Sequence, residues 1–450
     1  MPFGRFFDRG KSRPASAPEP VELEPVSEDS DDADVDGDGE TEAEALPAEH
    51  DDADWLSRAR GVLPTGASTG SKRVEALYGS ATAEGPTHFQ QAVGCRVIDA
   101  DGNEYIDCTM ALGSVALGYA EPTVTRAVVD AVAAGHVSGL SHIREVDLAE
   151  RLCGILPCAD KVQFLKTGAE AIAAAVRLAR TYTARDVVVG AGYFGWLDWC
   201  SDDTAGVPEG TRRAFRRVVW DDVASLEAAV AEAGASLAAI VIEPVVERLP
   251  SAAWIARARE LATASGAVLI FDEIKTGFRL KTGGYQAYAD VVPDLAAFGK
   301  AMANGYPLSC VAGDRDIMDA ARRTWISSTL ASEATALAAA SAVVAWHDQA
   351  DICESLWSIG AEMRSAFDAA LGASGVTGIR TDGLDPMWLL RFDDTSREQR
   401  FLELAAANGV LLKRGAYNYA ALAHDDDAVR QFEAGVSSAL VALRDEEARR

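Results

Sequence analysis

The sequence predicts an α/β protein in which helices cover both faces of a mostly parallel β-sheet. Two observations support this fold class. Short apolar runs rich in β-branched residues alternate along the chain with stretches of helical periodicity. These runs are continuously apolar, which is typical of strands that are buried on both faces. They fall at 187–189, 238–242, 268–271 and 295–298.

The remaining elements follow from the same periodicities. A hairpin is expected at 97–107, where two short strands surround an Asp-Gly-Asn turn, and another short strand is expected at 387–392. Apolar residues spaced three and four apart predict the helices. These helices are expected at about 122–134, 145–156, 168–182, 254–265, 333–347, 350–371, 396–408 and 426–444.

The negative charge of the chain is concentrated in its first segment. The 450 residues carry a formal charge of −27, and residues 1–54 hold 18 acidic and four basic residues, a net charge of −14. This segment is also poor in apolar residues, so it cannot offset the entropy of ordering. We expect a disordered acidic extension that could dock another protein, with order beginning near Trp55. The overall charge disfavours nucleic acid and anionic membranes as partners.

The pattern of cysteines and apolar residues indicates a cytoplasmic protein. Seven cysteines form no CxxC pair and six histidines are scattered, so we expect reduced thiols and no metal site. No apolar run reaches the roughly 18 residues that cross a bilayer. The first residues lack the apolar stretch of a secretory signal. We therefore expect a soluble, intracellular enzyme.

Two of the apolar strands are each followed by one ionisable residue. Asp272 follows the run 268–271, and Lys300 follows the run 295–298 after one glycine. Ligands of open α/β sheets bind outside the carboxyl ends of the strands, so both residues are expected to face one crevice. A lysine that forms a Schiff base and a carboxylate that keeps a pyridine nitrogen protonated suit pyridoxal phosphate. An ordinary ion pair that caps two strands fits the spacing equally well.

A third segment suits a phosphate group. Thr167 and Gly168 join an apolar strand end to the helix predicted at 168–182, whose free N–H groups would attract an anion. Simple N-capping by Thr167 is the alternative. No GxGxxG motif follows a strand, and Gly299-Lys300 lacks the rest of a Walker loop, so a nucleotide enzyme is not expected.

Taken together and in this order, the segments resemble the class III aminotransferases of pyridoxal-phosphate fold type I, in the branch of glutamate-1-semialdehyde aminomutase. The similarity runs from about Leu63 to His424. The segments that carry it are 99–107, 166–171, 239–244, 271–279 and 293–300. The resemblance implies a large cofactor-binding domain with a smaller α+β domain built from the N- and C-terminal segments. The implied division is 1–54 for the extension, 55–112 and 348–450 for the small domain, and 113–347 for the large domain.

The resemblance also implies residue roles. Lys300 and Asp272 would be catalytic, Lys300 as the Schiff-base lysine that moves the proton and Asp272 as the partner of the pyridinium nitrogen. Ile274 and Tyr193 would lie against the two ring faces, with Glu243 near the ring. The implied phosphate ligands are Thr167, Gly168 and Ala169, with Ser328 and Thr329 from the second subunit of a homodimer that shares its active sites.

Departures from the family pattern bear on the substrate. Phe194, expected at the cofactor, stands where the family usually has histidine, and the segment that begins at Ser328 also differs. These changes alter the pocket while Lys300 and Asp272 are kept. Arg73 is a candidate ligand for a substrate carboxylate, with a surface role equally open, and Trp196 is a second candidate substrate contact.

The sequence therefore predicts a pyridoxal-5′-phosphate-dependent aminotransferase. It would move an amino group from an amino acid donor to a ketone or aldehyde of specialised biosynthesis, such as natural-product or amino-sugar metabolism. The alternative is an aminomutase or epimerase of the glutamate-1-semialdehyde aminomutase type. A non-catalytic assembly subunit would belong to a different class.

Overall fold

A computed structural model describes residues 51–449, which belong to one compact unit. The predicted disordered extension, residues 1–54, lies mostly outside the described residues. Only its last four residues, 51–54, fall within them. Helix α1 (Asp52–Val62) begins three residues before the expected start at Trp55. Asp51 caps the helix by accepting the Asp54 N–H at 2.8 Å, and the Asp52 carboxylate accepts the Thr87 hydroxyl at 2.6 Å. The predicted end of the extension at residue 54 is thus wrong by a few residues, because these acids bond to the folded chain.

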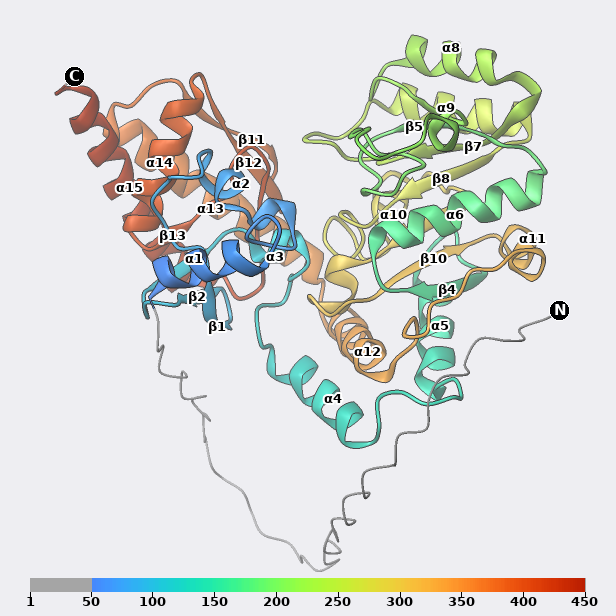
Figure 1. The fold of residues 1–450 in the computed structure, drawn as a ribbon, viewed down its shortest axis with the longest axis horizontal. Coiled ribbons are helices and arrows are strands. Elements are labelled where there is room, and N and C mark those ends of the chain that lie inside the picture. The colour runs from blue at the N-terminus through green and yellow to red at the C-terminus, as the bar shows by residue number, and fades with distance from the viewer. Residues whose placement is uncertain (1–50, 450) are drawn as a thin grey trace, which may run out of the picture. The chain divides into compact units, whose positions relative to one another are not determined.

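A seven-stranded sheet forms the larger part of the molecule (Figure 1). Strand β10 runs antiparallel to both of its neighbours, and the other neighbouring strands run parallel. The prediction of a mostly parallel sheet is confirmed. In sheet order the strands are β4 (Lys161–Leu165), β10 (Ser309–Gly313), β9 (Leu295–Phe298), β8 (Val268–Asp272), β7 (Leu237–Ile242), β5 (Val187–Ala191) and β6 (Phe215–Arg217).

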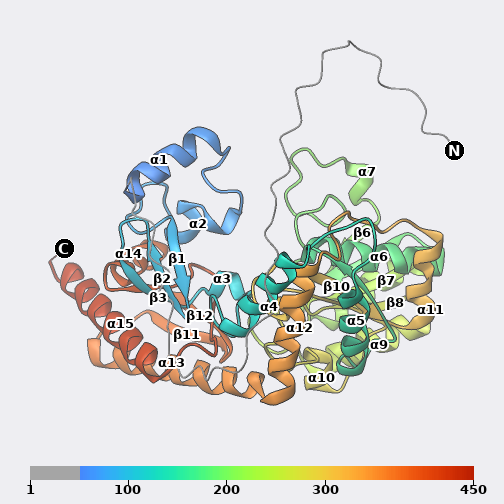
Figure 2. The same ribbon diagram turned by 90° about the horizontal axis from the view of Figure 1, so that it is seen from below.

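Helices cover both faces of this sheet. Helix α6 (Gly168–Thr183) packs on strands β4 and β7–β10, and its buried face is rich in alanine, which lets the helix lie close to the strands. Helices α8 (Val223–Ala233) and α9 (Ala252–Ser265) pack on β5, β7 and β8 (Figure 1). Helix α4 (Pro122–Ala133) lies beside α12 (Ala334–Gln349), as Figures 1 and 2 both show.

Two smaller sheets join the two ends of the described chain. The short strand β13 pairs in parallel with β3, so segments about 300 positions apart in the sequence share one sheet. The smaller α+β domain from N- and C-terminal segments is confirmed, and its boundaries at 112 and 347 stay predictions. Its strands are β1 (Phe89–Val93), β2 (Arg96–Asp99), β3 (Glu104–Asp107) and β13 (Val410–Leu411), and β11 (Ile379–Leu384), β12 (Met387–Phe392) and β14 (Tyr417–Tyr419).

Three long helices pack around these strands (Figure 2): α13 (Ile352–Ser374), α14 (Thr395–Ala407) and α15 (Asp426–Glu447). Helix α5 (Ile143–Ile155) is as long as α14, and the remaining helices are short: α2 (Val74–Tyr78), α3 (Met110–Gly113), α7 (Glu209–Arg212), α10 (Tyr285–Ala289) and α11 (Arg315–Met318). No helix in residues 51–449 is long and apolar enough to cross a membrane.

Arg279 links the end of β8 to the smaller sheets. Its side chain is fully buried, and its guanidinium donates to the backbone carbonyls of Pro386, Ala420, Gly113 and Val115 at 2.6–3.3 Å. Burial lowers the pKa of Arg279 to about 10, so the group stays charged at neutral pH. This buried cation ties the backbone at Pro386 and Ala420 to the segment that follows β8.

Candidate active site

Asp272 and Lys300 lie at the same edge of the large sheet. Asp272 is the last residue of β8, and Lys300 follows Gly299 directly after β9. The two strands are parallel neighbours, and Asp272 is in register with Ala297. Lys300 has a φ of +49°, a left-handed conformation that costs a lysine energy and that occurs more often at functional positions. The structure thus brings the two predicted catalytic residues to one edge of the sheet.

The environment of Asp272 favours a positively charged partner. Burial and then the negative charge of Glu243 raise the pKa of Asp272 to about 8, although the Ile274 N–H, which donates to Oδ1 at 3.1 Å, and the nearby lysines act against this. Its Oδ2 accepts no hydrogen bond from residues 51–449. A protonated ring nitrogen beside this oxygen would stabilise the carboxylate and lower its pKa.

Lys300 is placed to act as a neutral amine. Burial, followed by the positive charge of Lys275, lowers the pKa of Lys300, while Asp272 and Glu243 oppose the change. A lysine with a lowered pKa is unprotonated more often and attacks an aldehyde carbon more readily.

The start of helix α6 forms a cradle for an anion. Thr167 caps the helix: its hydroxyl accepts the Glu170 N–H at 3.2 Å, and Glu170 Oε2 accepts the Thr167 N–H at 2.9 Å. The capping alternative is therefore present, but it leaves the N–H groups of Gly168 and Ala169 without an acceptor in the described chain. Those two N–H groups at a helix N-terminus suit a phosphate.

Two glycines bring the walls of the site close to this cradle. A Cβ atom on Gly168 would lie 2.5 Å from Cδ1 of Ile274, and a Cβ atom on Gly195 would lie 2.5 Å from Cβ of Ala169. Ile274 therefore lies between the cradle and the Lys300 turn, since its Cγ2 is also within 3.7 Å of the Cβ position on Gly299.

Tyr193 and Phe194 point in different directions. The Tyr193 side chain is largely exposed, and its N–H donates to Oε2 of Glu243 at 2.9 Å. Phe194 is only 2% exposed and is stacked on Trp199 at 6.1 Å, with its edge against Phe215. Phe194 thus packs into the core, and the prediction that it contacts the cofactor stays a prediction.

Three other predicted residues lie wholly or partly at the surface. Trp196 is 74% exposed, and neither the Ser328 nor the Thr329 hydroxyl makes a hydrogen bond to it or to another described residue. The predicted contribution of Ser328 and Thr329 from a second subunit stays a prediction.

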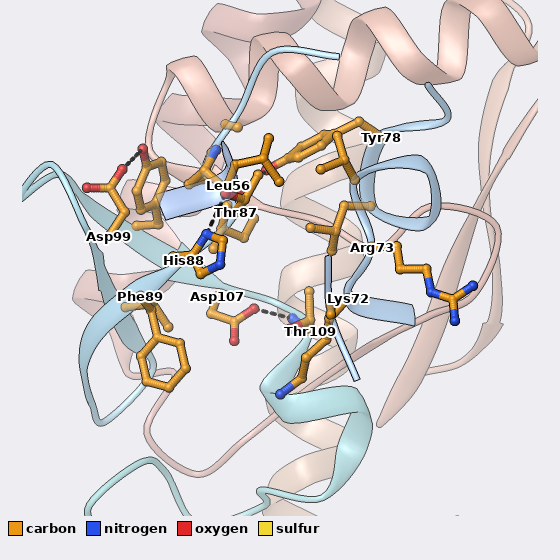
Figure 3. A pocket seen from close by; sticks show the side chains of 18 of the residues that line it. Leu56, Lys72, Arg73, Tyr78, Thr87, His88, Phe89, Asp99, Asp107 and Thr109 are labelled. Atoms are coloured by element: carbon orange, nitrogen blue, oxygen red, sulfur yellow. Dashed lines mark hydrogen bonds between the residues drawn. The ribbon is translucent and has the colours of Figure 1, made fainter. Parts of the chain in front are cut away.

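Arg73 lies on a separate cavity. This cavity of about 460 Å³ is lined by the segment before β1 and by strands of the smaller sheet, and neither Asp272 nor Lys300 lines it. Figure 3 shows Lys72 and Arg73 on one side of it and His88 on the other. Arg73 therefore lines a cavity that does not contain Asp272 or Lys300, and its role as a ligand for a substrate carboxylate stays a prediction.

The sequence did not single out two residues that meet at the site. Lys275 Nζ pairs with Glu243 Oε1 at 2.7 Å and donates to the Tyr417 hydroxyl at 3.0 Å. Lys275 lies in the same sequence motif as Asp272, and its positive charge three residues after Asp272 is the feature that could have marked it as a site residue. Tyr417 lies 142 positions away on β14, and no local pattern connects it to Lys275.

These groups fit pyridoxal 5′-phosphate. A lysine with a lowered pKa, a buried carboxylate with an open oxygen and a helix N-terminus with two free N–H groups match an aldehyde, a pyridine nitrogen and a phosphate. The cradle at Gly168 and Gly195 has no room for larger side chains.

Comparison with known proteins agrees with this chemistry. Residues 79–191 and 211–424 match the class-III aminotransferase family. The chain is 32% identical over 361 residues to a 2′-deamino-2′-hydroxyneamine transaminase of Streptomyces kanamyceticus, covering 78% of this chain and 91% of that protein. It is 31% identical over 437 residues to a glutamate-1-semialdehyde 2,1-aminomutase of Sorangium cellulosum, covering 88% and 99%.

Solved structures agree as well. The FumI protein of Sphingopyxis sp. MTA144, solved with its pyridoxal-phosphate cofactor, is 27% identical and superposes with a TM-score of 0.83 over 88% of this chain and 97% of that one. A transaminase solved with the same cofactor shares the fold, with a TM-score of 0.80 over 88% and 98% of the two chains at 24% identity. The chain therefore belongs to the class-III aminotransferases and is a pyridoxal-phosphate-dependent transaminase of fold type I.

Proposed function

We propose that the enzyme transfers the amino group of an amino acid donor to a ketone or aldehyde carbonyl of specialised metabolism, with an oxidised amino sugar as the acceptor class. One observation carries this choice of acceptor. Both cations that act on Lys300 already have partners: Lys275 pairs with Glu243, and Arg279 donates to four carbonyls. A site whose nearby cations are engaged favours an acceptor without a carboxylate over one that carries an extra carboxylate. The similarity to an aminoglycoside-type transaminase supports the same class.

In this proposal each residue has one task. Lys300 would hold the cofactor at rest and, once released, its amine would take up the proton that leaves the substrate carbon bearing the amino group. Asp272 holds the ring nitrogen in its protonated state, while Ile274 and Tyr193 flank the ring. The N–H groups that follow Thr167 hold the phosphate. When bound, pyridoxal phosphate supplies an electron sink for the carbanion that forms at the substrate carbon.

We also propose that the enzyme is a cytoplasmic homodimer. Ser328 of the partner subunit and Thr329 of the partner subunit would then complete the phosphate cradle. In this chain Ser328 is half-buried and Thr329 is exposed, which leaves both side chains accessible to a second subunit.

The central test is the replacement of Lys300. Purified wild-type protein should be yellow, and borohydride should add the mass of the reduced cofactor to the peptide that contains Lys300. Lys300→Ala should lose this adduct and reduce turnover by about 10²- to 10⁴-fold or more. The exposed Lys281→Ala is the matched control and should keep both. A wild-type protein that forms no adduct would contradict the proposed role.

A second experiment separates transfer from isomerisation. The protein would be given amino acid donors together with either a ketone of an amino sugar or a keto acid, and the products would be identified by mass spectrometry. The proposal expects release of a keto acid and amination of the sugar ketone. An isomer formed from a single amino aldehyde, with no keto acid released, would favour the aminomutase alternative, which the similarity to glutamate-1-semialdehyde 2,1-aminomutase supports.

A further inference from the structure

Lys275 is the centre of a buried charged cluster beside Asp272. Its side chain is 9% exposed, and its ammonium group lies 2.7 Å from Glu243 Oε1, 3.0 Å from the Tyr417 hydroxyl and 4.2 Å from the centre of the Tyr417 ring. The three residues come from the ends of β8 and β7 and from β14 of the smaller domain. One lysine thus joins three parts of the fold at the site.

Each partner of Lys275 is held by a second contact. Glu243 Oε2 accepts the Tyr193 N–H at 2.9 Å, and Gly192 packs so closely that a Cβ atom there would overlap the Glu243 side chain. The Tyr417 hydroxyl accepts the Glu247 N–H at 2.6 Å. These contacts fix the position of the Lys275 charge before any substrate binds.

Stability alone does not explain this arrangement. Removing two charges from water costs several kcal/mol per ion, and apolar residues of similar volume often stabilise a fold as well as a buried ion pair does. The cluster is therefore better explained by its effect on its neighbours. Positive Lys275 and negative Glu243 act in opposite directions on both Lys300 and Asp272.

We propose that Lys275 is a positioning residue of the active site, whose charge, paired with Glu243 and anchored by Tyr417, sets the electrostatic environment of the Asp272–Lys300 edge. This inference rests on the proposed cofactor roles of Lys300 and Asp272. The charged groups that act on Lys300 are Lys275, Asp272, Glu243 and Arg279, and the titratable groups that act on Lys275 are Glu243, Tyr417 and Tyr419.

The test is a pH titration of the visible absorption of the purified holoenzyme, which reports protonation of the Lys300 nitrogen. Lys275→Met removes a positive charge and should raise the apparent pKa of this nitrogen by about one pH unit or more. Glu243→Gln removes a negative charge and should lower it. The double variant, which leaves no unpaired buried charge, should fall between the two single variants. Lys281→Met removes an exposed lysine from the same segment and should leave the titration unchanged.

Opposite shifts from the two single variants would support the proposal, because a purely structural defect does not change sign with the charge removed. If Lys275→Met does not fold, the comparison of the double variant with Glu243→Gln measures the effect of Lys275, and a raised pKa is again expected. Shifts of the same sign, or a Lys275→Met titration equal to that of Lys281→Met, would overturn the proposal. A wild-type protein without a cofactor band or a Lys300 adduct would instead contradict the proposed function.

Discussion

At the scale of single residues, the site depends on close approach as much as on charge. Gly168 stands where the phosphate cradle meets Ile274, and a Cβ atom on Gly168 would lie 2.5 Å from Cδ1 and 3.2 Å from Cγ2 of that side chain. Any larger residue at 168 must displace Ile274, which is proposed to lie against the cofactor ring. Glycine is therefore required at 168 by the approach of Ile274, since this glycine does not adopt a positive φ.

We expect Gly168→Ala to raise the dissociation constant of pyridoxal phosphate about tenfold, the cost of about 1.4 kcal/mol of overpacking. Equilibrium dialysis of the cofactor measures this change. Ile274→Val removes the clashing Cδ1 atom, so the double variant should bind the cofactor as well as Ile274→Val alone does. Equal losses in the single and the double variant would show that Ile274 is not the cause.

At the scale of elements, the small domain depends on a close crossing between helix α13 and the turn that joins β11 to β12. A Cβ atom on Gly360 would overlap the backbone carbonyl of Asp385, and a backbone group cannot move aside as a side chain can. The same helix contains Gly372, which is exposed and has nothing within 4 Å of its Cβ position. One helix thus holds a glycine that packing requires and a glycine that it does not.

Gly360→Ala should lower the free energy of unfolding by about 1–3 kcal/mol or more, because the helix must shift away from the turn. Gly372→Ala should raise it by up to about 1 kcal/mol, since alanine favours the helix more than glycine does. Urea unfolding followed by circular dichroism measures both. A Gly360→Ala protein as stable as the wild type would show that the crossing can relax.

Whether a helix or strand could be predicted from the sequence depended on its length and its environment. Helix 168–182 was expected and α6 spans Gly168–Thr183, and strand 295–298 coincides with β9. These elements carry their own periodic or apolar pattern. Strand β14 was not predicted, because a segment as short as Tyr417–Tyr419 is extended only through pairing with a distant strand.

At the scale of the whole molecule, buried histidines connect its stability to pH. His424 is almost fully buried: its Nδ1 accepts the Ala421 N–H at 3.0 Å, and Nε2 lies 3.2 Å from the Asp107 carbonyl oxygen. This arrangement uses the neutral ring. Burial lowers the pKa of His424 to about 4, and burial likewise lowers the pKa of His347 to about 4.

The sign of the pH effect follows from these lowered values. Near pH 7 the histidines are neutral in both states, and as the pH falls below about 6.5 the unfolded chain takes up protons that the folded chain refuses until about pH 4. Each histidine should therefore remove about 3 kcal/mol of stability between pH 7 and pH 4. The urea midpoint should fall over this range, and His424→Gln should reduce the slope. An unchanged slope in the variant would show that His424 is protonated without unfolding.

In the candidate site, too, some features depend on neighbouring residues in the sequence and others on contacts between distant residues. The positions of Asp272, Lys300 and Gly168 were predictable because each stands at the end of a strand or the start of a helix. The direction of Phe194 was not, because its packing against Trp199 and Phe215 decides it. Arg73 was paired with the site by resemblance, yet it lines a different cavity.

The sequence by itself determined the α/β order of elements and the two ionisable residues at strand ends, because hydrophobic period and strand length are properties of neighbouring residues. Only the tertiary structure decided that Lys275 meets Glu243 and Tyr417, that Phe194 turns into the core and that Arg279 is held by carbonyls of the small domain. These contacts join residues from distant parts of the chain, and packing and hydrogen bonding establish them only when the strands have come together.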